Sequence, residues 1–251
     1  MARRRYLHEM TQPEAAAALA ESRTAILVVG SVEQHGSHLP LGTDAHAALA
    51  IAERVSESLG APIVLASLVG VAPYHEPWPG SLTLEPATLI ALLEDLAAGL
   101  HRAGAERLLF VNWHEGNTPT LRLAGQAIQA ATGARVVIAE AHVITNGLFP
   151  DEMEFTHAGA METAAVLAYD EQLVRLDEAS DPTDRETGDR GHELYRRRDV
   201  FPILSDFREI APSGWYGDPG RVSAERAGEI IDQVAQRVSE RAREVWERLE
   251  R

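Results

Sequence analysis

The sequence contains no cysteine, which excludes a disulfide framework and any metal site built on thiolates. A metal ion would have to bind to imidazole and carboxylate side chains instead. Basic residues are also few, because 23 arginines and lysines stand against 38 aspartates and glutamates, for a net charge of -15. Such a charge repels phosphate backbones and anionic lipid surfaces, so the composition argues against nucleic acid and membranes as partners.

Long apolar runs are missing as well, since no stretch of about 18 apolar residues is present that could span a bilayer. The first ten residues include Arg3, Arg4 and Arg5 but lack the apolar core and small-residue cleavage site of a secretory signal. We therefore expect a cytoplasmic protein. The length of 251 residues suits one large domain with a substantial core, so we expect a single domain over residues 1–251.

Short apolar runs alternate with helix-length segments along most of the chain. The runs are rich in β-branched residues, as is typical of strands buried on both faces of a sheet. Prolines near the start and glycines after the end of the intervening segments mark helix boundaries. This alternation predicts an α/β fold in which helices cover a parallel or mixed sheet. The predicted strands are 25–30, 62–66, 107–112 and 135–139, and the predicted helices are 45–59, 86–103, 119–132, 160–168 and 224–251.

Two features near the C-terminus differ from this regular pattern. Residues 181–199 are dense in charge and poor in apolar periodicity, which predicts a surface excursion that could be a lid, an inter-subunit arm or a solvated loop. The last helix keeps apolar residues, including Val245 and Leu249, near helical spacing. We expect this helix to pack back on the domain.

The end of the first predicted strand leads directly into Glu33 and His35. On extended backbone, residues two apart project to the same side, and Gly36 and Gly42 permit the sharp path that could return Asp44 to them. The carboxyl edge of an open α/β sheet is where ligands bind. Each residue alone could be a loop residue bonded to backbone, but together they favour a site for zinc, manganese or iron(II).

The third predicted strand ends in a second polar segment. It places His114 and Glu115 at the same edge of the sheet, between Asn112 and Asn117, whose amides can tie down such turns. Trp113 could be a core aromatic that anchors the loop, or it could stack on a substrate.

A third polar segment, with His157 and Glu162, precedes and enters the helix predicted from residue 160. A carboxylate in the first turn of a helix can be a metal ligand, a base or simply a cap. In residues 75–80, two prolines and Trp78 form a stiff segment just before Ser81. We name Trp78, Ser81 and Trp113 as candidates for substrate contact. His75, His142 and His192 could each reach a pocket, although a lone histidine is more often structural.

These segments together resemble the creatininase family, and their order and spacing make the signal specific. The resemblance implies a three-layer α/β/α fold with a mostly parallel sheet and a homohexameric assembly. It also implies a site with two divalent metal ions that hydrolyses non-peptide C–N bonds, commonly in cyclic amides or formamides. The matching segments are GSVEQHGSHLPLGTD at 30–44, PGSLTL at 79–84, NWHEGN at 112–117, HAGAMET at 157–163 and, more weakly, GWYGDPGRVSAERAG at 214–228.

The resemblance also implies roles for individual residues. Glu33, His35 and His114 are similar to the terminal metal ligands of the family, and Asp44 is similar to the carboxylate that bridges both ions. His157 resembles a residue that assists proton transfer to the leaving nitrogen. We expect zinc in the site, with manganese or iron(II) as alternatives.

The chain departs from creatininase itself at the fifth ligand. Creatininase has a glutamate two residues after the histidine that matches His114, whereas this chain has Gly116 there and Glu115 one residue earlier. Many relatives have glycines at both positions and rely on the glutamate that matches Glu162. We therefore expect Glu162 to be the fifth ligand, with Glu115 as the second choice. The same departure argues against creatinine as the substrate.

The expected reaction is the hydrolysis of a small-molecule amide by a metal-activated water. Two metal ions about 3.5 to 4 Å apart lower the pKa of a bridging water and polarise the amide carbonyl. His157 or Glu115 could then protonate the leaving nitrogen. The alternatives are a peptidase-like processing enzyme of the same family, a binuclear phosphoesterase, and a metal-binding protein without turnover.

Overall fold

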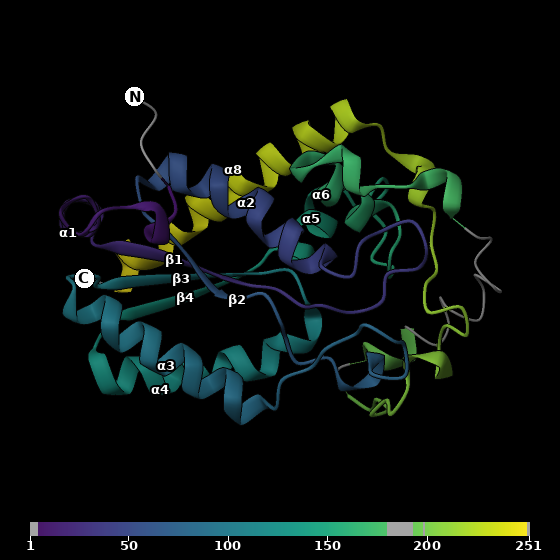
Figure 1. The fold of residues 1–251 in the computed structure, drawn as a ribbon, viewed down its shortest axis with the longest axis horizontal. Coiled ribbons are helices and arrows are strands. Elements are labelled where there is room, and N and C mark those ends of the chain that lie inside the picture. The colour runs from purple at the N-terminus through teal and green to yellow at the C-terminus, as the bar shows by residue number, and fades with distance from the viewer. Residues whose placement is uncertain (1–4, 180–192, 198, 250–251) are drawn as a thin grey trace.

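The computed structural model describes residues 5–179, 193–197 and 199–249. Its centre is a parallel sheet of four strands in the order β2-β1-β3-β4, which Figure 1 shows between two layers of helices. The predicted α/β class with a parallel sheet is therefore confirmed. The strands are β1 (Thr24–Val29), β2 (Ile63–Ser67), β3 (Arg107–Asn112) and β4 (Arg135–Glu140).

Helices cover both faces of the sheet. In Figure 1, α3 and α4 lie below it, and α2, α5, α6 and α8 lie above it. No described helix combines the length and apolar character needed to cross a membrane. The α-helices are α1 (Gln12–Ser22), α2 (Thr43–Leu59), α3 (Pro86–Arg102), α4 (Thr118–Thr132), α5 (Ala141–Leu148), α6 (Ala160–Tyr169) and α8 (Ala224–Leu249). Short 3-10 helices are Leu7–Glu9, Pro73–His75, Glu115–Asn117, Glu171–Leu173, Leu176–Glu178, Phe207–Glu209 and Pro219–Arg221.

The central strand β1 explains why three layers form. All six of its residues are buried, and successive side chains point to opposite faces of the sheet. Ile26 and Val28 belong to the core shared with α2, α6 and α8, whereas Ala25, Leu27 and Val29 belong to the core shared with α3 and α4. A strand with apolar residues on both faces needs a helical layer on each side.

Two helices had no counterpart in the prediction from sequence. In α1, the backbone N–H and the hydroxyl of Thr11 donate to the Glu14 carboxylate at 2.7 and 2.8 Å. This capping pair starts a helix that has only Ala18 and Leu19 buried, so its apolar periodicity is weak. The other is α5, which begins directly after β4 without a turn segment.

The last helix packs against the other elements as predicted, but in its final turns the buried residues differ from the predicted ones. Ile230 and Val234 are fully buried, as the spacing predicted. Val245 and Leu249, however, are 39% and 48% exposed, and Trp246 is buried in their place. The bulky indole fills the space near the start of β3, where the Arg107 guanidinium lies 5.5 Å from its ring.

The segment predicted as a charged excursion falls mostly outside the described residues. Of residues 181–199, the structure describes 193–197 and 199. The choice between lid, arm and solvated loop therefore stays a prediction.

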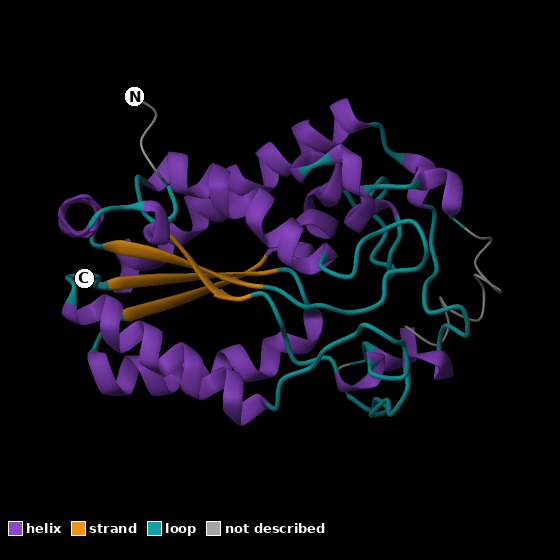
Figure 2. Cartoon of the chain, in the orientation of Figure 1, coloured by secondary structure: helices purple, strands orange, loops and turns teal. Residues whose placement is uncertain are grey.

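The loops that follow the strands gather at one end of the sheet, as Figure 2 shows. One side chain connects three of these loops. The Asn117 amide oxygen accepts from the Val71 N–H at 2.9 Å, and its nitrogen donates to the Gly30 carbonyl at 3.0 Å and to the Asn112 side chain at 3.2 Å. The segments after β1, β2 and β3 are thereby held at fixed distances from one another.

The core of α3 predicts a matched pair of stability effects. Leu93 is fully buried, so Leu93→Ala should lower the free energy of unfolding by about 2–5 kcal/mol through lost burial and the cavity left behind. Leu123 on α4 is 57% exposed, so Leu123→Ala should change it by no more than about 0.5 kcal/mol. Urea unfolding followed by circular dichroism measures both, and equal effects would contradict this account of the core.

Candidate metal centre

Ionisable side chains from four parts of the chain converge at the carboxyl edge of the sheet. Because parallel strands end at the same edge, the loops after β1 and β3 and the starts of α2 and α6 meet there. Each of these residues is at most 8% exposed. They are Glu33 and His35 after β1, Asp44 in the first turn of α2, His114 after β3, and His157 and Glu162 at the start of α6.

One group consists of His114 and the two carboxylates that face one of its ring nitrogens. Its Nδ1 lies 3.2 Å from Glu33 Oε2 and 3.4 Å from Asp44 Oδ2. The other nitrogen, Nε2, lies 3.1 Å from the Val71 carbonyl and so acts as the donor. In the neutral ring, Nδ1 then presents a lone pair to two carboxylates, so the arrangement needs either a proton on Nδ1 or a cation between the three atoms.

A second group forms around His35. Its Nδ1 lies 3.1 Å from the Glu33 backbone carbonyl, which leaves Nε2 facing Asp44 Oδ1 at 3.9 Å and Glu162 Oε2 at 3.7 Å. Among the residues that the structure describes, His35 Nε2 and Asp44 Oδ2 are buried without a hydrogen-bond partner. Orphaned buried polar atoms are rare in folded proteins, and imidazole with carboxylate is the donor set of a divalent metal. The residues present therefore fit metal ions.

Asp44 belongs to both groups, because one carboxylate oxygen faces His114 and the other faces His35. This is the geometry expected of a carboxylate that bridges two ions. Asp44 thus shares contacts with two pairs of residues, Glu33 with His114 and His35 with Glu162. Three groups have candidate ligand atoms that all lie within 4.8 Å of one another: Glu33, His35 and Asp44; His35, His157 and Glu162; and Glu33, His75 and His157.

The electrostatics of the cluster point the same way. Burial raises the pKa of the Glu33 carboxyl to about 7. Burial lowers the pKa of His35, but the carboxylates of Glu162, Asp44 and Glu33 outweigh it and raise that pKa to about 10. The pKa of His114 likewise rises to about 9 beside Glu33 and Asp44, despite its burial. Protons on the two histidines supply positive charge that bound cations would replace.

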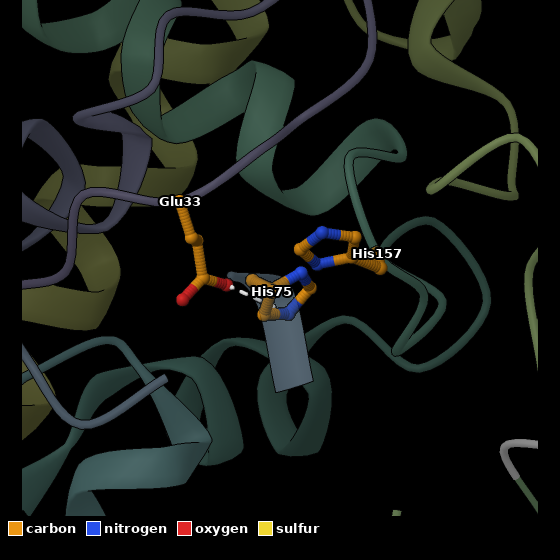
Figure 3. A group of neighbouring side chains, drawn as sticks. All are labelled: Glu33, His75 and His157. Carbon is orange, nitrogen blue, oxygen red and sulfur yellow. Dashed lines mark ion pairs between the residues drawn. The ribbon is translucent and has the colours of Figure 1, made fainter. Parts of the chain in front are cut away.

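Glu33 is held by residues that do not belong to either group. The Ser31 hydroxyl donates to Glu33 Oε2 at 2.7 Å, and His75 Nε2 lies 3.3 Å from Glu33 Oε1, the contact drawn in Figure 3. His75 Nδ1 in turn lies 3.3 Å from the Gln34 side-chain nitrogen. Such outer partners fix the orientation of a metal-ligating side chain. The sequence offered no periodicity or pairing that set His75 apart from a structural histidine.

His157 stands beside His75 in Figure 3, with the ring centroids 5.0 Å apart. Its Nε2 lies 3.0 Å from both the carbonyl oxygen and the side-chain nitrogen of Gln34. Donation to the carbonyl leaves the Gln34 amide hydrogens for His75 and the Gly214 carbonyl, so we assign the proton of His157 to Nε2. Burial and the nearby His35 charge hold the pKa of His157 well below its usual value.

Glu162 makes two contacts that bear on the roles left open by the sequence. Its Oε2 accepts a hydrogen bond from the N–H of Ala158, the residue before the N-cap Gly159 of α6. The same oxygen faces His35 Nε2, as a metal ligand would. His35 and His157 lower the pKa of Glu162 against the opposing effect of burial.

Glu115 points elsewhere. Its side chain is 39% exposed and pairs with Arg196, with 3.1 Å between Glu115 Oε2 and the arginine Nε. At the next position, a Cβ on Gly116 would lie 2.5 Å from the Val71 carbonyl and would collide with the His114 ring. The backbone that lets His114 donate to Val71 has no room for a side chain at 116. This excludes a glutamate at that position without movement of the loop.

The candidates for substrate contact are divided by the structure. Trp113 lines a cavity together with most of the cluster, and its indole N–H is buried without a partner in the described part of the chain. Ser81 and Trp78 do not line it. The Ser81 hydroxyl accepts from the Gln34 N–H at 3.0 Å, and the Trp78 ring lies 6.1 Å from that of His75. Ser81 thus contacts the loop after β1, and Trp78 contacts the loop after β2.

Comparison with known proteins finds similarity to the creatininase family. The family model for creatininase, described as creatinine amidohydrolase, matches residues 8–242. Creatinine amidohydrolase of Pseudomonas putida is 26% identical, with 95% of this chain and 96% of that protein aligned. The mycofactocin precursor peptide peptidase of Mycolicibacterium smegmatis is 38% identical, but over only 39% of this chain and 42% of that protein.

Solved structures agree with the family model. A creatinine amidohydrolase superposes with a TM-score of 0.77 over 94% of this chain and 95% of that one, at 23% identity, which shows the fold. A manganese creatininase superposes with a TM-score of 0.74 at 26% identity, covering 95% of this chain and 97% of that one. A zinc–zinc form of a creatininase mutant gives 0.75 at 25% identity, covering 96% and 98%.

The crowding at Gly116 predicts a loss of metal binding without any change to a ligand. Gly116→Ala should displace His114 or the Val71 carbonyl, lower the metal content per chain and cost about 1–3 kcal/mol of stability through overpacking. Gly147→Ala is the matched control, because a Cβ there meets nothing within 4 Å. Metal analysis by mass spectrometry and thermal unfolding measure both effects. Unchanged metal content in the 116 variant would contradict the packing described here.

Proposed function

Because this chain belongs to the creatininase family of hydrolases, we propose that it hydrolyses a non-peptide C–N bond of a small amide with two divalent metal ions. The substrate class is a cyclic amide or formamide. One observation carries the proposal: Asp44 directs one oxygen to each of two groups of buried ligands. We expect zinc, with manganese or iron(II) as alternatives, in a cytoplasmic homohexamer.

The contacts support a ligand assignment. Glu33 and His114 would hold one ion, and His35 and Glu162 would hold the other, with Asp44 shared. Glu162 is proposed as the fifth ligand because it faces His35, whereas Glu115 is turned to Arg196.

Divalent ions, when bound, supply Lewis-acid polarisation of the amide carbonyl and activation of a water. The chain's own residues do the rest. The Nε2–H of His157 donates a hydrogen bond to the Gln34 carbonyl. The other ring nitrogen, Nδ1, then faces Glu162 and lies 3.9 Å from its Oε2. A neutral Nδ1 can take the proton from the attacking water and return it to the leaving nitrogen. Trp113 can donate its unpaired indole N–H to a polar atom of the substrate.

Cleavage of a small modified peptide is the second candidate. It is favoured by the 38% identity to a mycofactocin precursor peptide peptidase over 39% of this chain. A substrate screen of lactams, hydantoin-like rings and formamides beside short peptides separates the two. Turnover of peptides alone would replace the first proposal by the second.

A series of three carboxylate variants tests the metal site. Wild-type protein purified without chelator should carry about two divalent ions per chain. Asp44→Ala should lose most of both, because it removes the shared ligand, and Glu162→Gln should weaken the ion beside His35. Glu115→Gln is the matched control and should keep both ions. Mass spectrometry of bound metal decides, and no metal above background after reconstitution would refute the proposal.

His157 should be required for turnover and dispensable for metal binding. His157→Ala should keep the metal content of the wild type and lower kcat by about 10²- to 10⁴-fold, the usual contribution of a proton-transfer residue. His101→Ala, at the other end of the sheet, should leave kcat unchanged. Wild-type turnover in the 157 variant would remove His157 from the mechanism.

A further inference from the structure

Arg196 is the one arginine among the described residues that line the cavity over the metal centre. Its side chain is 24% exposed, and burial lowers its pKa to about 10, so it is a cation at neutral pH. Sequence analysis did not single out Arg196, because it lies in the charged segment far from every motif. A guanidinium in a cavity lined by carboxylates raises the question of what it binds.

The head of Arg196 is fixed by Phe155. The guanidinium carbon lies 3.2 Å from the centroid of the Phe155 ring, and the NH1 group donates to the Phe155 carbonyl at 2.8 Å. Stacking and this hydrogen bond together set the plane of the guanidinium. A planar fork held in one orientation is pre-organised to bind a planar anion.

The group that faces this fork is the carboxylate of Glu115. One oxygen, Oε2, accepts from Nε and lies near NH2, both at 3.1 Å. Together with NH1, these contacts engage three of the five N–H groups, and within the described residues the other two have no hydrogen-bond acceptor. The Glu115 side chain is 39% exposed, so it can turn to water at little cost.

We propose that Arg196 binds a carboxylate of the substrate, which takes the place of Glu115. The substrate is then an amide that carries a carboxylate separate from the bond that is cleaved. This inference rests on the proposed function and narrows its substrate class.

Charge balance favours a carboxylate over a phosphate. Exchange of the Glu115 carboxylate for a substrate carboxylate leaves the charge around Arg196 unchanged and reuses the same donors. A phosphate dianion would bring one more negative charge than Glu115 carries to the one arginine among the described residues that line the cavity.

Arg196 is also placed to orient the substrate over the metal centre. Glu115, its partner, directly follows the ligand His114 in the chain. His142 lines the same cavity, and burial together with the Arg196 charge lowers the pKa of His142 to about 3, so its ring stays neutral. When the substrate carboxylate is bound to Arg196, the rest of the substrate would thus be directed toward the metal ligands.

A matched pair of ligands tests the proposal. N-acetylglycine and N-acetylglycinamide share one amide and differ in a carboxylate or carboxamide, and their Kd values are measured by calorimetry on the metal-loaded protein. The wild type should prefer the acid by about tenfold or more, because a charge-assisted bidentate contact is lost in the carboxamide. Arg196→Gln should abolish the preference, and Arg196→Lys should keep part of it.

Two further variants separate recognition from folding. Glu115→Gln should strengthen binding of the acid, because it weakens the competitor for Arg196, whereas a purely structural ion pair predicts no gain. Arg208→Gln, which removes an arginine paired with Asp206 outside the cavity, should keep the wild-type preference. The proposal is overturned if Arg196→Gln still prefers the acid, if the wild type binds both ligands equally, or if it binds neither.

The same titrations with chelator-treated protein separate this inference from the proposed function. If the chelator-treated protein prefers the acid, and no metal binds when metal is added back, the carboxylate site is supported and the metal-dependent reaction is refuted. Two bound ions and amide turnover without any preference for the acid would do the opposite.

Discussion

The structure depends on the placement of three carboxylates in one buried site. Glu33, Asp44 and Glu162 are each at most 8% exposed and face the rings of His35 and His114. Isolated charges in such a place are strongly unfavourable, so the cluster exists only where positive charge is supplied. Protonated imidazoles can supply it, and two divalent cations can do so more fully. The metal ions of the proposed function would satisfy the same constraint that shapes the site.

The surrounding fold serves to hold these groups at fixed distances. The parallel sheet delivers the loops to one edge, and the Asn117 side chain joins three of them. Val71, from the loop after β2, accepts from His114, and His75 from the same loop supports Glu33. The loop after β2 thus contributes orientation to both ligands. Ligand geometry in such sites is set as much by these outer contacts as by the ligands.

The segment after His114 shows how one family scaffold can change its cavity. With no room for a side chain at Gly116, the carboxylate at this turn belongs to Glu115, which pairs with Arg196 and lines the cavity. Glu162 faces His35 from the start of α6. This turn therefore places an anion and a cation beside the cavity, while Glu162 keeps its contact with His35.

The sequence by itself determined the α/β class, the four strands and the order of the polar segments, because apolar runs and helix boundaries are local signals. The resemblance added a ligand set whose members the structure brings together. Only the tertiary structure decided which carboxylate faces which histidine, that His75 supports Glu33, that Ser81 and Trp78 lie off the cavity, and that Arg196 enters it. These contacts join residues that are distant in the chain, and their partners are chosen by packing and by the path of each loop. The periodic pattern within one segment does not determine these long-range contacts.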